Sequence, residues 1–200
     1  MKANTYIDLL RHGETVGGNC FRGSTNDPLT ELGWTQLWAV TDENESCWDR
    51  IITSPLRRCA DFAQSLGQKH SILTTRDERF QELHFGAWEG RSADELMKTD
   101  ADALSQFWND PVCNTPPQGE SLLDFERRVL SGWEDILSAN MGERILLVTH
   151  GGVIRLLLCH ILQRPLQCLL EFEIGHATIQ PIRVEHTPRG LRATLIETNV

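Results

Sequence analysis

The chain has 200 residues, of which 40% are hydrophobic and 24% are charged, and its formal net charge is −9. This length favours a single domain over residues 1–200 with a sizeable core, and the negative charge argues against nucleic-acid and acidic-membrane partners. No apolar stretch is long enough to cross a membrane, and the N-terminus lacks the apolar segment of a signal peptide, so we expect a cytoplasmic protein.

Short apolar runs alternate with helical patterns along most of the chain. The strand-like runs lie near residues 5–10, 49–53, 70–75 and 144–149. The helical patterns cover residues 30–41 and 55–66, a long stretch from about 121 to 137, and a segment that begins just after residue 150. The first and last strand-like runs are typical of strands buried on both faces. The alternation predicts an α/β fold, a three-layer α/β/α sandwich with a mostly parallel central sheet.

Residues 84–119 interrupt this alternation. They contain short helical patterns at 93–98 and 101–108 and a Pro-rich stretch. We interpret the segment as an insertion over the edge of the sheet and a candidate lid, although an ordinary surface excursion fits the pattern equally well. The tail from Leu169 onward alternates as two or three strands, with a turn at residues 188–190.

Two histidines occupy matching positions at the ends of predicted buried strands. His12 follows the first strand and precedes Gly13, and His150 follows the fourth strand and precedes Gly151. Ligands of open α/β sheets bind beyond the carboxyl ends of the strands, and glycine permits close approach of the backbone to a ligand. A lone histidine is more often structural, but two in the same setting predict two imidazoles at one functional rim.

Arginines near these positions predict an anion site. Arg11 directly precedes the first histidine, and Ser54 and Pro55 form a helix-start pattern after the second strand. This pattern places Arg57 and Arg58 in the first helical turn, where free N–H groups and the helix dipole favour an anion such as phosphate. The spacing does not indicate which of the two points inward, and either one alone is also consistent with a surface charge.

Transfer of a phosphoryl group also requires a proton for the departing oxygen. Glu82 is a candidate donor because it lies among aromatic residues and glycines at positions 80–90, whereas most isolated glutamates are solvated. Glu14 and Glu89 are the competing acids, and we assign them structural roles.

Four segments, taken together and in this order, resemble the histidine phosphatase superfamily with its phosphoglycerate-mutase-like fold. They are the Arg-His-Gly-Glu-Thr motif at 11–15, the Ser-x-Leu-x-Arg pattern at 54–58, the acidic and aromatic stretch at 82–90, and Thr-His-Gly-Gly at 149–152. They span most of the chain, and their combination is specific, whereas the Arg-His-Gly triplet alone would be weak.

The resemblance implies a role for each motif residue. His12 would be the nucleophile that becomes phosphorylated, with a backbone carbonyl fixing its other N–H. Arg11, Arg58 and His150 would hold the phosphoryl group, which favours the second of the two helix-start arginines. Glu82 would protonate the leaving oxygen and then help to activate water. The family needs no metal or other cofactor, and its partner is a small-molecule phosphate monoester.

The first loop departs from the family pattern. Many members carry an asparagine three residues after the threonine of the Arg-His-Gly-Glu-Thr motif, but Gly18 occupies that position and Asn19 follows it. We expect Asn19, or else Arg22 and the loop N–H groups, to contact the substrate, together with Gly151.

Within the superfamily, the resemblance is to the alpha-ribazole phosphatases of adenosylcobalamin nucleotide-loop assembly. The segments at 16–23, 27–30, 82–90 and 119–121 carry it. It implies hydrolysis of alpha-ribazole 5'-phosphate. Trp88 or Trp108 would be able to stack on a benzimidazole ring, although core packing is the more common role of such residues.

Other functions remain open alongside this one. A broad-specificity phosphatase or a cofactor-dependent phosphoglycerate mutase would use the same phosphohistidine, but Lys98 is the only basic residue in 92–120, which argues against a mutase and against a sugar 2,6-bisphosphate phosphatase. A non-catalytic phosphate-binding protein is disfavoured because all five core positions are filled. The sequence is consistent with a monomer or a homodimer.

Overall fold

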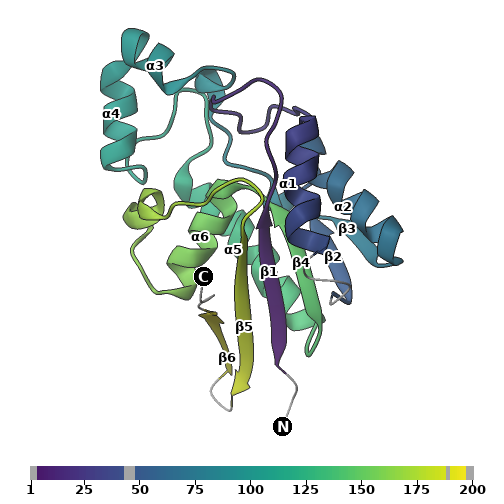
Figure 1. The fold of residues 1–200 in the computed structure, drawn as a ribbon. Coiled ribbons are helices and arrows are strands. Elements are labelled where there is room, and N and C mark those ends of the chain that lie inside the picture. The colour runs from purple at the N-terminus through teal and green to yellow at the C-terminus, as the bar shows by residue number, and fades with distance from the viewer. Residues whose placement is uncertain (1–3, 43–47, 188–189, 197–200) are drawn as a thin grey trace.

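A computed structural model of the protein describes residues 4–42, 48–187 and 190–196. The strands are β1 (Thr5–Arg11), β2 (Arg50–Thr53), β3 (Leu73–Arg76), β4 (Arg144–Thr149), β5 (Ile179–Thr187) and β6 (Gly190–Leu195). They form one sheet in the order β3-β2-β4-β1-β5-β6 (Figure 1). The first four strands run parallel to one another, whereas β5 and β6 are antiparallel to their neighbours. The predicted mostly parallel sheet is confirmed.

Helices cover both faces of the sheet. They are α1 (Glu31–Asp42), α2 (Arg57–His70), α3 (Ala93–Thr99), α4 (Ala101–Asn109), α5 (Leu122–Ala139) and α6 (Gly151–Ile161). Successive side chains of a strand point to opposite faces. Ile7 and Leu9 of β1 accordingly join one core cluster with Trp133 of α5. Leu10 joins the other cluster with Phe62 of α2. Figure 1 shows α1 and α2 on one side of the sheet and α5 and α6 on the other, so the three-layer prediction is confirmed.

The start of α2 differs from the prediction. The pattern predicts Ser54 as the N-cap and Pro55 as the first helical residue, but the helix begins at Arg57 and its N-cap is Leu56. The Ser54 hydroxyl accepts from the Leu56 N–H at 3.4 Å and also bonds to the ring of His150 at 2.7 Å. The hydroxyl therefore bonds both to the backbone just before the helix and to a distant segment, and Leu56 takes the N-cap position.

Two predicted strands begin later than expected. Because α2 continues to His70, β3 begins at Leu73. Residues 166–171 form a 3₁₀ helix, so the strands of the tail begin only at Ile179. The first two residues of the turn predicted at 188–190 lie outside the described residues, and the third is the first residue of β6.

The parallel strands bring their carboxyl ends to one edge of the sheet. Figure 1 shows α3 and α4, which belong to the predicted insertion at 84–119, lying beyond this edge. Across the described parts of the chain, no helix has the length and apolar character needed to cross a membrane.

Candidate active site

The two motif histidines meet at the carboxyl edge of the sheet. β1 and β4 are parallel neighbours, with Arg11 opposite Thr149, so His12 and His150 leave the sheet side by side. The backbone N–H of His12 donates to the Thr149 carbonyl at 3.0 Å, and the centroids of the two imidazole rings are 5.4 Å apart. The predicted pair of imidazoles at one rim is therefore present.

His12 is held as a neutral imidazole. Its Nδ1 lies 2.8 Å from the Gly13 carbonyl, which only accepts, so Nδ1 carries the proton and Nε2 keeps its lone pair. Burial lowers the pKa of His12 well below its ordinary value, and the nearby Arg58 guanidinium lowers it further. Both effects favour the form that is able to attack phosphorus, and the expected carbonyl partner is found.

His150 is fully buried behind the other groups of the site. Arg58 Nε donates to its Nδ1 at 3.2 Å, so Nε2 carries the proton and donates to Ser54 Oγ at 2.7 Å. Burial, and then the charge of Arg58, lower the pKa of His150 well below its ordinary value. His150 does not reach the wall of the cavity described below, so here it contacts the site through Arg58.

The two arginines at the start of α2 differ in orientation, one pointing into the site and the other to the surface. Arg58 is 1% exposed, and its Nη1 and Nη2 donate to the carbonyls of Thr25 and Gly23 at 2.6 and 2.8 Å. Arg57 is exposed and pairs with Asp61 at 3.3 Å. Arg58 is thus the arginine that points inward. Burial lowers its pKa, although a guanidinium remains charged at neutral pH.

Arg11 has a second arginine beside it that the sequence analysis missed. Arg11 Nη1 donates to the Ile174 carbonyl at 2.5 Å, while its buried Nε has no hydrogen-bond partner among the described residues. Arg155 of α6 lies, like Arg11, beside Gly151 and donates through Nε to the Phe172 carbonyl at 2.8 Å. Arg155 lies four residues after Gly151, which is about one helical turn. That spacing is the feature of the sequence that indicates a place for Arg155 near the site.

Glu82 reaches the same site from an irregular segment. Its Oε1 accepts from the Leu83 N–H at 3.0 Å, and its Oε2 accepts from the Gly152 N–H at the start of α6 at 3.1 Å. A Cβ at position 152 would lie 2.2 Å from Oε1, so only glycine leaves room for this carboxylate.

The two competing acids have the structural roles assigned to them. Glu14 accepts from the Thr30 hydroxyl at 2.7 Å. Glu89 accepts from the backbone N–H groups of Ser24 and Thr25 at 2.9 and 3.0 Å. Glu89 therefore fixes the loop whose carbonyls hold the inward arginine of α2.

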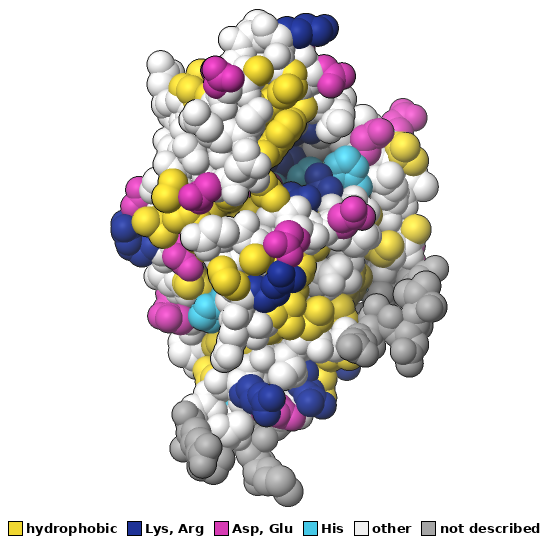
Figure 2. Space-filling model, turned by 90° about the vertical axis from the view of Figure 1, so that its left-hand side faces the viewer, with side chains coloured by type: hydrophobic (Ala, Val, Ile, Leu, Met, Phe, Trp, Pro, Cys, Tyr) yellow, Lys and Arg dark blue, Asp and Glu magenta, His cyan; other side chains and the backbone are white. Residues whose placement is uncertain are grey.

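Part of this set of groups surrounds one cavity of about 280 Å³. Its basic and acidic lining residues are Arg11, His12, Arg22, Arg58, Glu82 and Arg155. Its aromatic lining residues are Phe21, Phe85, Phe107, Trp108 and Phe125. Figure 2 shows this arrangement as a hollow in which Lys, Arg and His side chains gather beside hydrophobic ones. An acidic protein thus presents a locally positive pocket with an apolar wall.

The remaining predicted contacts divide between the cavity and the surface. Arg22 lies on the cavity wall and pairs with Asp27 at 3.3 Å, whereas Asn19 is exposed and lies outside the wall. Gly151 also lies outside the wall, and its neighbour Gly152 lies on it. Arg22 is therefore better placed than Asn19 to contact a ligand.

The insertion contributes directly to the cavity. Its Phe107, Trp108 and Pro111 line the wall, and Trp108 is 44% exposed. Trp88, by contrast, is a core residue whose Nε1 donates to Asp100 at 2.8 Å. The insertion thus has a place at the site, and its movement as a lid stays a prediction.

A third histidine near the site was also missed. His176 follows the 3₁₀ helix of the tail, and its ring centroid lies 5.7 Å from that of His12. It has an exposed side chain and does not line the cavity. No motif marks it, because β5 and the loop before it are brought to β1 only by the sheet.

The family follows from a comparison with known proteins. Residues 7–197 match the model of the histidine phosphatase superfamily (branch 1). The chain belongs to this superfamily. The match covers every motif residue around the cavity, so the family resemblance seen in the sequence is confirmed.

Relatives within the histidine phosphatase superfamily carry varied names. "Putative phosphoserine phosphatase 2" of Hydrogenobacter thermophilus is 29% identical over 194 residues, which cover 96% of this chain and 93% of that protein. The bifunctional protein Rv2228c of Mycobacterium tuberculosis is 34% identical over 158 residues, which cover 77% of this chain but 43% of that protein. The first name is that of a phosphatase, and the second states no substrate.

Solved structures of the superfamily share the fold over nearly the whole chain. Mycobacterial glucosyl-3-phosphoglycerate phosphatase Rv2419c has a TM-score of 0.86 at 25% identity, with 98% of this chain and 99% of that chain covered. The alpha-ribazole phosphatase of Shigella flexneri has a TM-score of 0.81 at 23% identity, with 96% of each chain covered. The second likeness shows the fold alone, so the predicted substrate is not established by these comparisons.

The two neutral buried histidines of this histidine phosphatase predict a pH-dependent stability. In the unfolded chain both regain an ordinary pKa of about 6.5, so below that pH the unfolded state binds more protons than the folded state. The free energy of unfolding is therefore expected to fall with falling pH by up to about 1.4 kcal/mol per pH unit for each histidine. Urea titrations between about pH 5.5 and 7.5 measure this slope. His12→Gln and His150→Gln should each flatten it, and an unchanged slope in both variants would contradict the neutral assignment.

Proposed function

We propose that the protein hydrolyses small-molecule phosphate monoesters through a phosphohistidine intermediate on His12. The observation that carries the proposal is a neutral imidazole, with its Nε2 lone pair available, on the wall of a pocket rich in arginine. A covalent intermediate replaces one difficult displacement by two easier ones.

The charge of the pocket is suited to a phosphate monoester. Arg22 is paired with Asp27, which leaves Arg11, Arg58 and Arg155 facing Glu82. Three cations face a single acidic group, so the net charge is about two positive with Glu82 ionised and about three with it protonated, and either value complements the dianion of a phosphate monoester. Donors fixed by the fold at the position of the transferring group stabilise its charge without reorganisation.

Each step has an assigned group. Nε2 of His12 forms a bond to phosphorus as the bond from phosphorus to the ester oxygen breaks, and the protonated Glu82 carboxyl gives its proton to that oxygen. In the second step water attacks the phosphohistidine, and the Glu82 carboxylate takes a proton from that water. Inorganic phosphate leaves, and His12 returns to its neutral form with Glu82 protonated again.

For the substrate, we propose alpha-ribazole 5'-phosphate. Its alcohol part is an uncharged nucleoside with a flat aromatic base, which fits the apolar wall formed by Phe107 and Trp108. Lys98, the only basic residue of the segment 92–120, does not line the cavity. The segment 92–120 therefore places no cation on the cavity wall to bind the carboxylate of a phosphoglycerate, which disfavours the mutase alternative.

The direct test is a comparison of kcat/KM for alpha-ribazole 5'-phosphate, 3-phosphoglycerate, phosphoserine and p-nitrophenyl phosphate, with EDTA present. We expect the first to be preferred by at least about tenfold, the scale of stacking one base on an aromatic side chain. Trp108→Ala should remove most of this preference by raising KM, whereas Leu123→Ala, which is also exposed but lies outside the cavity, should not. Comparable values for all esters would indicate a broad-specificity phosphatase, and isomerisation of 3-phosphoglycerate would indicate a mutase.

Glu82→Gln tests the proton donor. The variant should lose about 100-fold or more in kcat for an alkyl phosphate, whose leaving oxygen needs the proton. It should lose far less for p-nitrophenyl phosphate, whose leaving group is stable as an anion. Equal losses on both esters, measured side by side, would remove Glu82 from the role of general acid.

A further inference from the structure

The segment that carries Glu82 has little regular structure of its own. Glu82 lies between two short 3₁₀ helices, Glu78–Phe80 and Gly86–Trp88. A general acid must stay within hydrogen-bond reach of the oxygen that it protonates, and a displacement of about 1 Å costs about 100-fold in rate. An irregular segment therefore needs fixing by groups from outside it.

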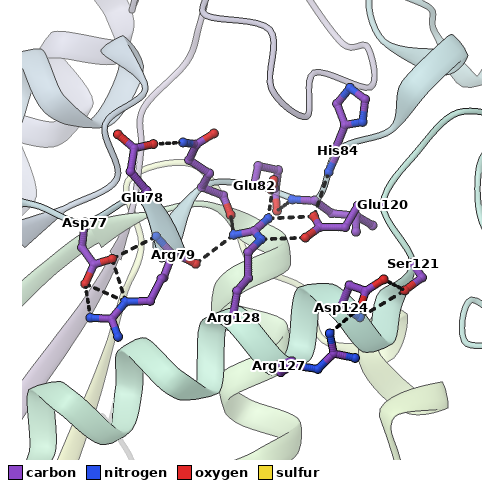
Figure 3. Close-up of polar contacts among 12 residues, drawn as sticks. Asp77, Glu78, Arg79, Glu82, His84, Glu120, Ser121, Asp124, Arg127 and Arg128 are labelled. Carbon is purple, nitrogen blue, oxygen red and sulfur yellow. Dashed lines mark hydrogen bonds and ion pairs between the residues drawn. The ribbon is translucent and has the colours of Figure 1, made fainter.

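Arg128 of α5 supplies that fixing. Its Nη1 donates to the carbonyls of Arg79 and Gln81, both at 2.8 Å, and its Nη2 donates to the carbonyl of Glu82 itself at 3.0 Å. Figure 3 shows the guanidinium reaching from the helix to the backbone on the amino-terminal side of the acid. These three carbonyls would otherwise need water or would remain unsatisfied.

Glu120 completes the clamp. Its carboxylate accepts from Arg128 Nε and Nη2 at 2.7 and 2.8 Å, so the five N–H donors of the guanidinium are all used. The backbone N–H of Glu120 donates to the His84 carbonyl at 2.8 Å, and its carboxylate lies 3.4 Å from the His84 N–H. The backbone is thus held on both sides of Glu82 (Figure 3).

We propose that Arg128, locked by Glu120, is a positioning residue for the general acid. Arg128 does not line the cavity and so does not contact the substrate. It acts through Glu82, whose carboxylate is placed against the Gly152 N–H only if its backbone stays in this position. The inference rests on the proposed function, because it matters only if the carboxyl of Glu82 transfers a proton.

The test is the leaving-group dependence of kcat in Arg128→Lys. Lysine keeps the charge but has three donors on one nitrogen, so it is unable to hold three carbonyls and a bidentate carboxylate at once. We expect a loss of about 10- to 100-fold in kcat for an alkyl phosphate, a change of at most a few-fold for p-nitrophenyl phosphate, and little change in either KM. Arg127→Lys is the matched control, because Arg127 is the next residue on α5, is 77% exposed and pairs with Asp124. It should leave both rates unchanged.

Glu120→Gln, alone and combined with Glu82→Gln, keeps the test decisive if Arg128→Lys unfolds. Glu120→Gln removes one half of the bidentate pair and should show the same selective loss in a smaller measure. Combining Glu82→Gln with Arg128→Lys or Glu120→Gln should add little to the loss from Glu82→Gln alone, because both changes disable one acid. Assays are run below the midpoint of thermal unfolding of each variant.

The outcomes separate this inference from the proposed function. If Glu82→Gln is selective for the alkyl ester but the Arg128 and Glu120 variants lose equally on both esters, Arg128 has only a structural role and the inference is wrong. If the double variants show additive losses, the inference is also wrong. If Glu82→Gln itself shows no selectivity, the general-acid role fails first, and the positioning role fails with it.

Discussion

Replacing His12 with alanine is expected to reduce the hydrolysis of every phosphate monoester by at least about four orders of magnitude, the scale of losing a catalytic nucleophile. The reason is geometric, because Nε2 of His12 is the imidazole nitrogen with a free lone pair on the cavity wall, whereas His150 uses both of its ring nitrogens in bonds to Ser54 and Arg58. No other imidazole lines this cavity among the described residues.

Two measurements check this expectation. One is kcat for p-nitrophenyl phosphate, which needs little help from an acid and so isolates the nucleophile. The other is acid-labile label on the protein after incubation with a ³²P-labelled ester, which the wild type should gain and His12→Ala should not. His176→Ala is the control, since its ring lies 5.7 Å from that of His12 but outside the cavity wall, and it should keep most of its activity. Substantial turnover or labelling in His12→Ala would refute the phosphohistidine mechanism, and ligand binding without label in the wild type would indicate a binding protein.

The parts of this site that the sequence predicted share one physical cause. Strands buried on both faces leave short apolar runs, and glycine follows where the backbone must come close to a ligand. Those signals are local, and they place His12 and His150 at one edge once the strands are taken as parallel. The stripe on α5 is a similar case, because residues such as Phe125, Val129 and Trp133 recur with the helical period and are all buried.

The parts that sequence reasoning missed depend on contacts between distant segments. An arginine in a predicted helix, such as Arg155, is usually expected at the surface. Arg155 lies near Arg11 only because α6 packs close to the end of β1. His176 has no motif around it, and the antiparallel pairing of β5 with β1 brings it to the site. The predicted N-cap, Ser54, lies two residues before the actual one, and its hydroxyl bonds to a residue 96 positions away as well as to the Leu56 N–H. Patterns of spacing carry no information about such partners.

Arg58→Ala is expected to reduce kcat/KM by about 100- to 1,000-fold, corresponding to about 3–4 kcal/mol of transition-state stabilisation. Arg58 is almost fully buried on the cavity wall, and each nitrogen of its guanidinium is oriented by one bond, to His150, Thr25 or Gly23. The second N–H of each terminal nitrogen therefore already has a fixed direction before the substrate binds. This makes the guanidinium a preorganised donor for a phosphoryl oxygen.

The same change also removes donors from the buried His150 Nδ1 and Gly23 carbonyl and from the part-buried Thr25 carbonyl. The cost in the free energy of unfolding is about 1–3 kcal/mol for each buried group left unsatisfied. Loss of stability and loss of catalysis are therefore measured separately, by urea titration and by kcat/KM under conditions in which each variant is folded.

Arg57→Ala is the matched control, because Arg57 is the preceding residue, is exposed and pairs with Asp61. It should change neither quantity by more than about 0.5 kcal/mol. A larger loss in Arg57→Ala than in Arg58→Ala would mean that the wrong arginine has been placed in the site. Recovery of part of the lost kcat when free guanidinium ion is added to Arg58→Ala would show that the charge itself acts on the transferring group. If the loss of activity were purely structural, the added ion would not restore it.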